Sequence, residues 1–281
     1  MIGLWVANLI IPGAPDKMTL NAPQGGWELH KAHDYSVAAA AIAAGKSANT
    51  YALENPVSMR AGGAAACDAA TDELTPLLLG ASFLTGRAVT SIASTMASEM
   101  QIVQPSSHWP RDRAMDTAAP VVSTETEFSD RLSKFVASWP GAGQQEKALL
   151  LVHHWLDALS CWSLEDLYLS SSTLLQIIVA TEEALTGKSH SYFDGATAAA
   201  GRVGISPLSR DFKDKRNNLI HEGHLLGPKF AGRSKDDCAQ VAADLLNWFD
   251  EYLHAALALG TVVRQRFSKS DFLTLNAYSL P

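Results

Sequence analysis

The sequence predicts an α+β protein in which a mixed, β-containing N-terminal domain precedes an all-helical bundle. Charged side chains are sparse in residues 1–104, which hold 13 of them, and dense in the remainder of the chain, which holds 38. The first part consists of short apolar runs between glycines and prolines, whereas the second shows apolar residues at three- and four-residue spacing. We therefore expect a β-containing domain over residues 1–104, a linker or extended connection over 105–126, and a helical domain over 127–281.

The N-terminal domain is expected to begin with a β-strand, because the run MIGLWVANLIIPG is apolar but too short to span a membrane. A helix is expected over residues 72–84, with acidic residues in its first turn and Pro76 near its start, where proline is tolerated. The apolar runs between residues 87 and 104 indicate further strands. No residue pattern in this domain points to a function.

Five amphipathic segments with short connections predict an antiparallel bundle in the C-terminal domain. They cover residues 127–139, 145–163, 165–186, 205–222 and 235–265. Ser234, which two aspartates follow closely, is expected to cap the N-terminus of the last helix. The Trp and Tyr residues of this half occur at helical spacing, which is more typical of a core than of a surface on which bases stack.

The composition is that of a globular protein, with 47% hydrophobic and 18% charged residues in 281. The net charge of −7 excludes a protein whose whole surface is positive and coats nucleic acid or an anionic membrane. The three cysteines form no C-x-x-C pair, and we interpret them as thiols in a reducing cytosol. With no membrane-spanning segment in the sequence, the expected location is the cytoplasm.

No cofactor or metal is expected. The glycines form no phosphate-binding loop, and no G-x-S-x-G nucleophile motif occurs. His30 and His33 lack further ligands nearby, and the adjacent His153 and His154 would point about 100° apart on a helix. We interpret all four as ordinary surface or core histidines.

One segment, SRDFKDKRNNLIHEG at residues 209–223, combines a helical pattern with residues that carry chemistry. Gly223 fits the left-handed position that ends a helix, which places His221 in the last turn. Arg216 precedes His221 by five residues, or about 140° around a helix. The two side chains therefore do not lie on one stripe of the helix. A long arginine can still reach a phosphate beside the helix that His221 also contacts, and pairing with the same helix of a second subunit would favour this arrangement.

The string KRNNLIHEG resembles the signature of the HEPN superfamily, which is an arginine, four to six residues, and then a histidine, often with a polar residue after the arginine. Arg216, Asn217 and His221 match these three positions. The resemblance covers residues 127–265, about half of the chain. It extends to the predicted helices of this region and to the position of the motif near the end of the helical domain.

The resemblance implies a helical bundle that forms a homodimer and brings two such motifs into one cleft. Its catalytic members are metal-independent endoribonucleases, many of them toxins or effectors of antiviral defence, so RNA and an antitoxin or activator protein are the implied partners. His221 would act as general acid/base and Arg216 would stabilise charge on the phosphorus. Asn217 would bind the phosphate or orient His221, and the 2′-OH would be the nucleophile.

The local charge fits an RNA site, since residues 202–235 hold eight basic and three acidic side chains, which leaves −12 for the rest of the chain. On this basis we expect Arg210, Lys213 and Lys215 to contact RNA. The resemblance further suggests that Glu182 or Glu183 supplies a polar group to the cleft, the alternative being an exposed glutamate at a helix end.

A second interpretation is a non-catalytic HEPN-like module that dimerises and binds a partner protein or ligand. In either case the N-terminal domain would sense a trigger, restrain the nuclease or select its substrate, and its residues do not decide among these roles. A small-molecule hydrolase is disfavoured because no nucleophile–base set is visible in the N-terminal part.

Overall fold

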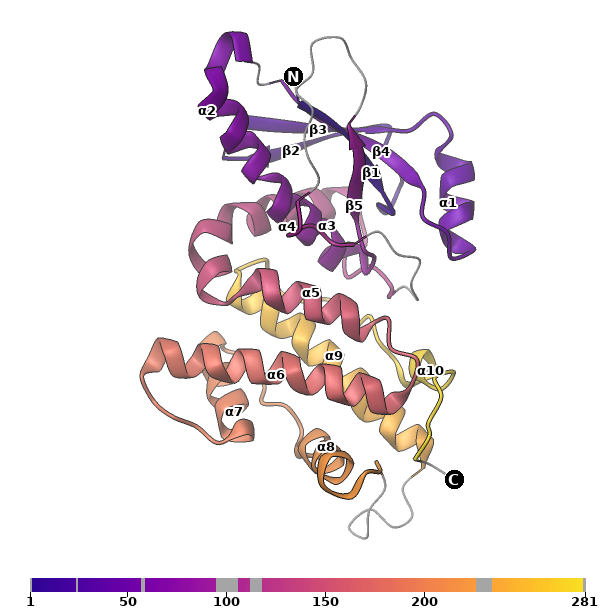
Figure 1. Cartoon of the computed structure of the whole chain (residues 1–281), viewed down its shortest axis with the longest axis vertical. Helices are drawn as coiled ribbons and strands as arrows, with labels where there is room; N and C mark the ends of the chain where they lie inside the picture. The colour runs from indigo at the N-terminus through magenta and orange to yellow at the C-terminus, as the bar shows by residue number, and fades with distance from the viewer. Residues whose placement is uncertain are drawn as a thin grey trace. The chain divides into compact units, whose positions relative to one another are not determined.

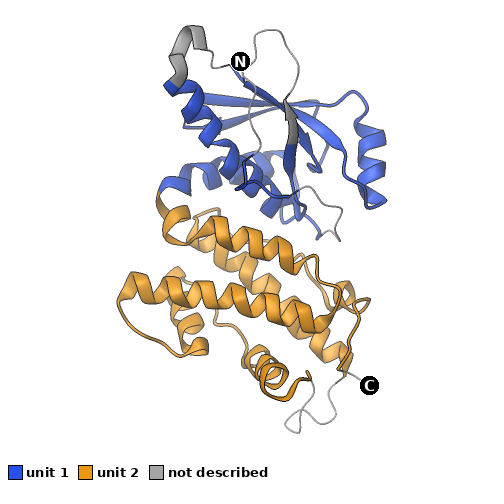
Figure 2. Ribbon diagram, viewed as in Figure 1, with its two compact units in different colours: residues 1–140 blue, residues 141–281 orange. Residues whose placement is uncertain are grey.

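The computed structural model describes residues 2–23, 25–56, 59–94, 106–111, 118–225 and 234–279 (Figure 1). It confirms the α+β prediction, because a five-stranded antiparallel sheet in the N-terminal region is followed by helices. The chain divides into two compact units, residues 1–140 and 141–281 (Figure 2).

The sheet of the first unit has the strand order β2-β3-β4-β1-β5, with every neighbouring pair antiparallel. The strands are β1 (Ile2–Ala7), β2 (Lys17–Ala22), β3 (Gly25–Lys31), β4 (Asn49–Asn55) and β5 (Thr90–Ser94). The register aligns Met18, Leu29, Leu53 and Leu4 in one row across four strands, and all four side chains are buried. Alternation along the strands thus gives the sheet one apolar face.

In the described residues of this unit, the sheet is accompanied by α1 (Tyr35–Ala43), α2 (Met59–Asp72), α3 (Leu74–Thr85) and α4 (Glu125–Ser138). The strand predicted at the N-terminus and the helix predicted over residues 72–84 are both present, as β1 and α3. Of the strands predicted between residues 87 and 104, β5 is present, and the run MQIVQ lies outside the described residues.

Helix α4 belongs to the first unit, although the sequence placed residues 127–139 at the start of the helical domain. It packs against α3, where a Cβ at Gly80 would lie 2.8 Å from Leu132 Cδ1 and 2.9 Å from Phe135 Cδ1. The Ser129 hydroxyl also donates a hydrogen bond to the carbonyl of Thr19 in β2. The sequence pattern marked a helix correctly, but only tertiary contacts assign it to a unit.

The second unit contains α5 (Ala148–Ala158), α6 (Leu164–Thr186), α7 (Tyr192–Val203), α8 (Arg210–Glu222), α9 (Lys235–Ala256) and the short α10 (Lys269–Phe272). A π-helical turn, η1 (Trp139–Gly143), precedes them. Ser234 caps α9 in a capping box with Asp237, as the sequence predicted. The helix ends at Ala256 rather than residue 265, because Ala258 and Gly260 adopt positive φ angles.

Helix α7 has no counterpart among the predicted segments, because its interior is rich in alanine and glycine and lacks large apolar residues at helical spacing. Small residues let it approach α6 closely: a Cβ at Gly195 would lie 2.6 Å from Val179 Cγ1. The core of the unit contains Trp155, Tyr168 and Tyr252, which confirms the core interpretation of these aromatic residues. Among the described helices, none is both long enough and apolar enough to cross a membrane.

Candidate functional site

The motif segment folds as the sequence predicts, into the thirteen-residue helix α8. The Ser209 side chain caps its N-terminus by accepting a hydrogen bond from the Asp211 amide. At the other end Gly223 adopts φ +75° and donates from its amide to the Leu219 carbonyl. These caps fix where the helix begins and ends, and they place His221 in the last turn.

The two faces of α8 differ in character. Phe212 and Lys215 are buried and anchor the helix to the unit, whereas His221 and Arg210 are exposed. At 100° per residue, Arg210, Asn217 and His221 fall within about 40° of one another and span about 16 Å along the axis. The exposed face therefore presents one polar stripe that ends at His221.

Arg216 lies at the side of this stripe and contacts the N-terminal end of α7. Its guanidinium carbon is 4.6 Å from the centroid of the Tyr192 ring, and its Nη1 donates to the Asn217 side-chain oxygen at 3.0 Å. Arg216 Nε is buried and has no hydrogen-bond acceptor among the described residues. Tyr192 is itself fixed, because its hydroxyl donates to the Ser172 carbonyl at 3.2 Å.

Burial raises the pKa of Tyr192 to about 12, against the opposing effects of the Ser172 hydrogen bond and the Arg216 charge. The ring is therefore neutral at physiological pH and offers its face to the guanidinium as a cation–π partner.

Two other residues that were predicted to contact RNA, Arg210 and Lys213, make cation–π contacts with the neighbouring ring of Phe193. The Arg210 guanidinium carbon lies 5.8 Å, and the Lys213 ammonium 5.7 Å, from the centroid of the Phe193 ring. Tyr192 and Phe193 are the first two residues of α7, so one helix end holds three cations of α8. We call Arg210, Lys213 and Arg216 the basic flank of α8.

That Tyr192 and Phe193 of α7 contact the basic flank was not predicted from the sequence. The signal that could have found it is Ser191, an N-cap residue directly before the two aromatic side chains.

The acidic residues of α8 lie on its other side. Asp214, Asp211 and Glu222 fall at about 40°, 100° and 120° from Arg210 in one direction, whereas the basic flank extends about 120° in the other. His221, about 20° from Arg210 toward the acidic side, lies between the two sectors, whereas Asn217, about 20° the other way, lies within the sector of the basic flank. The basic flank and the acidic side chains of α8, which are equal in number, thus lie on different sides of the helix.

Lys215 does not belong to this surface, contrary to the prediction that it contacts RNA. Its side chain is fully buried, and its ammonium donates to the Cys238 sulfur at 3.4 Å. Cys238 is on α9, 23 residues away, so this burial depends on tertiary packing that the sequence pattern does not reveal. The basic stretch is correspondingly weaker than predicted.

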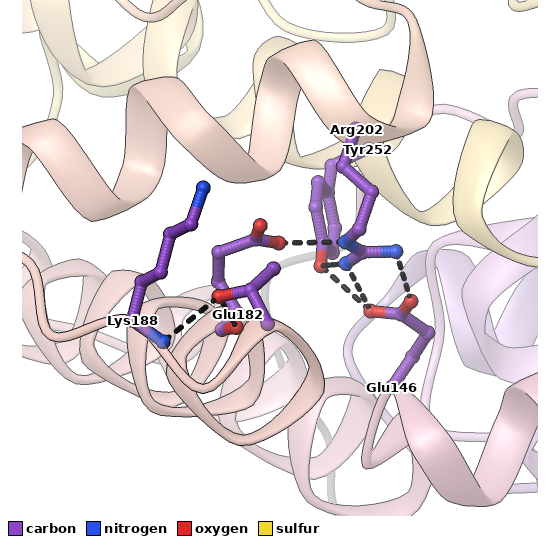
Figure 3. Close-up of polar contacts among 6 residues, drawn as sticks. Glu146, Glu182, Lys188, Arg202 and Tyr252 are labelled. Atoms are coloured by element: carbon purple, nitrogen blue, oxygen red, sulfur yellow. Dashed lines mark hydrogen bonds and ion pairs between the residues drawn. The ribbon is translucent and has the colours of Figure 1, made fainter.

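Glu182 is also buried, where it neutralises a second arginine. Arg202 of α7 lies between two carboxylates, with its Nε 2.6 Å from Glu182 Oε2 and its Nη1 2.7 Å from Glu146 Oε1 (Figure 3). The Tyr252 hydroxyl donates to Glu146 Oε2 at 2.7 Å and accepts from Arg202 Nη2 at 3.1 Å. Burial lowers the pKa of Arg202, but hydrogen bonds to the two carboxylates outweigh it and the net shift is upward.

One hydrogen-bonded cluster, Glu146–Glu182–Arg202–Tyr252, therefore joins α6, α7 and α9 to the segment that precedes α5. Its partners are separated by 20 to 106 residues, and sequence reasoning did not find it. It holds the position of α7, and so of the rings that contact the basic flank.

Glu183 has a local structural role. Its carboxylate accepts from the His190 amide at 2.8 Å and from the Ser189 hydroxyl at 3.3 Å, which orders the connection between α6 and α7. No described contact links Glu182 or Glu183 to His221 or Arg216. The predicted site thus narrows to Arg216, Asn217 and His221, with Arg210 and Lys213 beside them.

In the part of the chain that the structure describes, no group of three or more His, Cys, Asp or Glu side chains is arranged to hold a metal ion. Comparisons of the chain with protein-family models, with curated proteins and with solved structures gave no match.

Proposed function

We propose that the protein is a metal-independent endoribonuclease of the HEPN type, in which α8 supplies the reacting groups. The observation that carries the proposal is the surface of α8, which presents an exposed histidine in its last turn and a flank of three cations on the same helix. A histidine beside phosphate-binding side chains is the combination that cleavage of RNA at its 2′-OH requires.

In this proposal the O2′–P bond forms as the P–O5′ bond breaks, which leaves a 2′,3′-cyclic phosphate and a 5′-hydroxyl. One imidazole accepts the 2′-OH proton, and a second, protonated imidazole donates a proton to the departing O5′. Arg216 binds the non-bridging oxygens, on which negative charge increases in the transition state.

Two copies of the chain supply these groups. A single α8 has one motif histidine, and Arg216 diverges from it by about 140°. Pairing α8 with that of a second copy would bring two His221 and two Arg216 side chains to one phosphodiester. Asn217, which already accepts a hydrogen bond from Arg216, would keep the guanidinium oriented in that cleft.

The test is incubation of long RNA with the purified full-length chain in EDTA, followed by analysis of the product ends. We expect cleavage to 2′,3′-cyclic phosphate ends by the wild-type chain and by Arg264→Ala, an exposed arginine outside α8. We expect its loss in Arg216→Ala, and no cleavage of DNA of the same sequence. Cleavage of DNA, or equal rates for Arg216→Ala and the wild-type chain, would overturn the proposal.

The second candidate is a non-catalytic module that dimerises and binds a partner. It is favoured by the internal contacts of Arg216, which packs on Tyr192 and bonds to Asn217 as a structural arginine would. It predicts a dimer in sedimentation that leaves RNA intact, and the same assay with Arg216→Ala separates it from the nuclease.

A further inference from the structure

The second unit contains an open cleft of about 630 Å³ that the α8 site does not use. It lies between the C-terminal end of α7 and the C-terminal end of α9, with the segments that follow each helix. The residues that line it include Val203, Ile205, Ser206, Glu251, Ala255 and Val262. We call it the α7–α9 cleft, and its volume is in the range that small-molecule sites occupy.

The lining combines aliphatic and polar surface in comparable amounts, and one of its side chains carries a full charge. Val203, Ile205, Ala255 and Val262 supply aliphatic surface, and Glu251 supplies a half-buried carboxylate. Glu251 has no hydrogen-bond or ion-pair partner in the described part of the chain. Removing a carboxylate partly from water without a partner is unfavourable, so this position favours a cation that can enter the cleft.

The charges around the cleft do not oppose that preference. Buried Asp250 is adjacent to Glu251 and is paired with Arg266, Nε to Oδ2 at 2.6 Å, so these two charges balance. The cluster at Arg202, one residue before the lining, holds two carboxylates for one guanidinium. Two helix C-termini, which carry partial negative charge, also end at the cleft.

We propose that the α7–α9 cleft binds a small aliphatic amine, with its ammonium group against Glu251 and its alkyl chain along the aliphatic lining. The wall includes Val203–Ser206, the beginning of the segment that leads from α7 to α8. The inference is independent of ribonuclease activity, because it rests on a different set of residues and its test contains no RNA.

The test is calorimetric titration of the full-length chain with 1-aminohexane and with hexan-1-ol, which has the same alkyl chain without the charge. We expect one amine to bind per chain, at least tenfold more tightly than the alcohol. Glu251→Gln is expected to weaken amine binding tenfold or more. The matched control is Asp244→Asn, an exposed carboxylate on the same helix outside the lining, which is expected to leave the affinity unchanged.

Ser206→Phe gives a second, steric test, because the added ring would occupy the cleft without changing its charge. Equal affinities for the amine and the alcohol, or for Glu251→Gln and the wild-type chain, would overturn the proposal. A third ligand, N-acetyl-lysine methylamide, tests the source of the amine. Tighter binding of this compound than of 1-aminohexane would assign the cleft to a lysine side chain of a partner and overturn the assignment to a free small molecule.

Discussion

The guanidinium of Arg216 lies 4.6 Å from the centroid of the Tyr192 ring, so the motif arginine of α8 is positioned by the first residue of α7. The rest of α7 is held in place by Arg202 and its two carboxylates. The position of Arg216 therefore depends on the packing of α7 and on the cluster that holds α7, and not on the motif alone.

Tyr192→Ala is expected to lower kcat/KM for RNA cleavage about tenfold, because loss of a cation–π contact of about 1–2 kcal/mol frees the arginine from its orientation. Tyr192→Phe keeps the ring and loses only the hydrogen bond to Ser172, so its activity should stay near that of the wild-type chain. Steady-state cleavage of one RNA by both variants is the measurement. Equal losses in the two variants would show that the ring face has no positioning role.

Lys213 and Lys215 are expected to differ sharply, although both stand in the basic run. Lys213→Ala should weaken RNA binding and reduce the slope of log K against log salt concentration by about one, as for a lost phosphate contact. Lys215→Met should leave both the affinity and the slope unchanged, because Lys215 is buried. Filter binding at four salt concentrations measures both quantities, and a reduced slope for Lys215→Met would contradict the assignment.

Gly195→Ala should lower the free energy of unfolding by about 1–3 kcal/mol, because the new methyl group would meet Val179 where α6 and α7 approach closely. Gly201→Ala is the matched control on the same helix. A Cβ at Gly201 has no described neighbour within 4 Å, so that variant should be neutral or up to about 1 kcal/mol more stable. Urea denaturation of the two variants is the measurement, and equal values for them would contradict the close approach of α7 to α6.

The contact between Ser279, near the C-terminal end of the chain, and Glu165 of α6 is expected to stabilise the fold in a pH-dependent manner. Burial of Glu165 opposes its ionisation, but hydrogen bonds from the Ser279 hydroxyl at 2.6 Å and amide at 2.9 Å outweigh it and lower the pKa of Glu165. A lowered folded-state pKa adds stability that is fully present above the unfolded pKa of about 4.3 and is lost as the pH falls through the folded value.

Ser279→Ala should therefore cost about 1 kcal/mol at pH 7 and less at pH 3. Urea denaturation at the two pH values measures the difference, with the exposed Ser270→Ala as a control. A cost for Ser279→Ala that is the same at both pH values would be inconsistent with the Glu165 contact.

The elements that could be predicted are those whose signals are local. Ser209 and Gly223 mark the two ends of α8, and both act in the structure as the sequence indicates. Ser234 does the same for α9, and the apolar run at the N-terminus forms β1. Capping and strand alternation depend on neighbours within a few residues, so a single sequence contains them.

The features that could not be predicted depend on distant residues. The burial of Lys215 requires Cys238, and the neutralisation of Arg202 requires Glu146, 56 residues away. The Tyr192 contact with Arg216 requires α7, whose alanine-rich interior gives little periodic signal. The motif residues were visible in the sequence, but the side chains that position them were not.

The proposed proton transfer by His221 during RNA cleavage is tested most directly by the ratio of the cleavage rates of the wild-type and His221→Ala chains in EDTA. His224→Ala is the matched control, since it removes a nearby histidine whose ring bonds to the Glu222 carbonyl. We predict a loss of at least about 100-fold for His221→Ala and little change for His224→Ala. Cleavage by His221→Ala at the wild-type rate would contradict the claim.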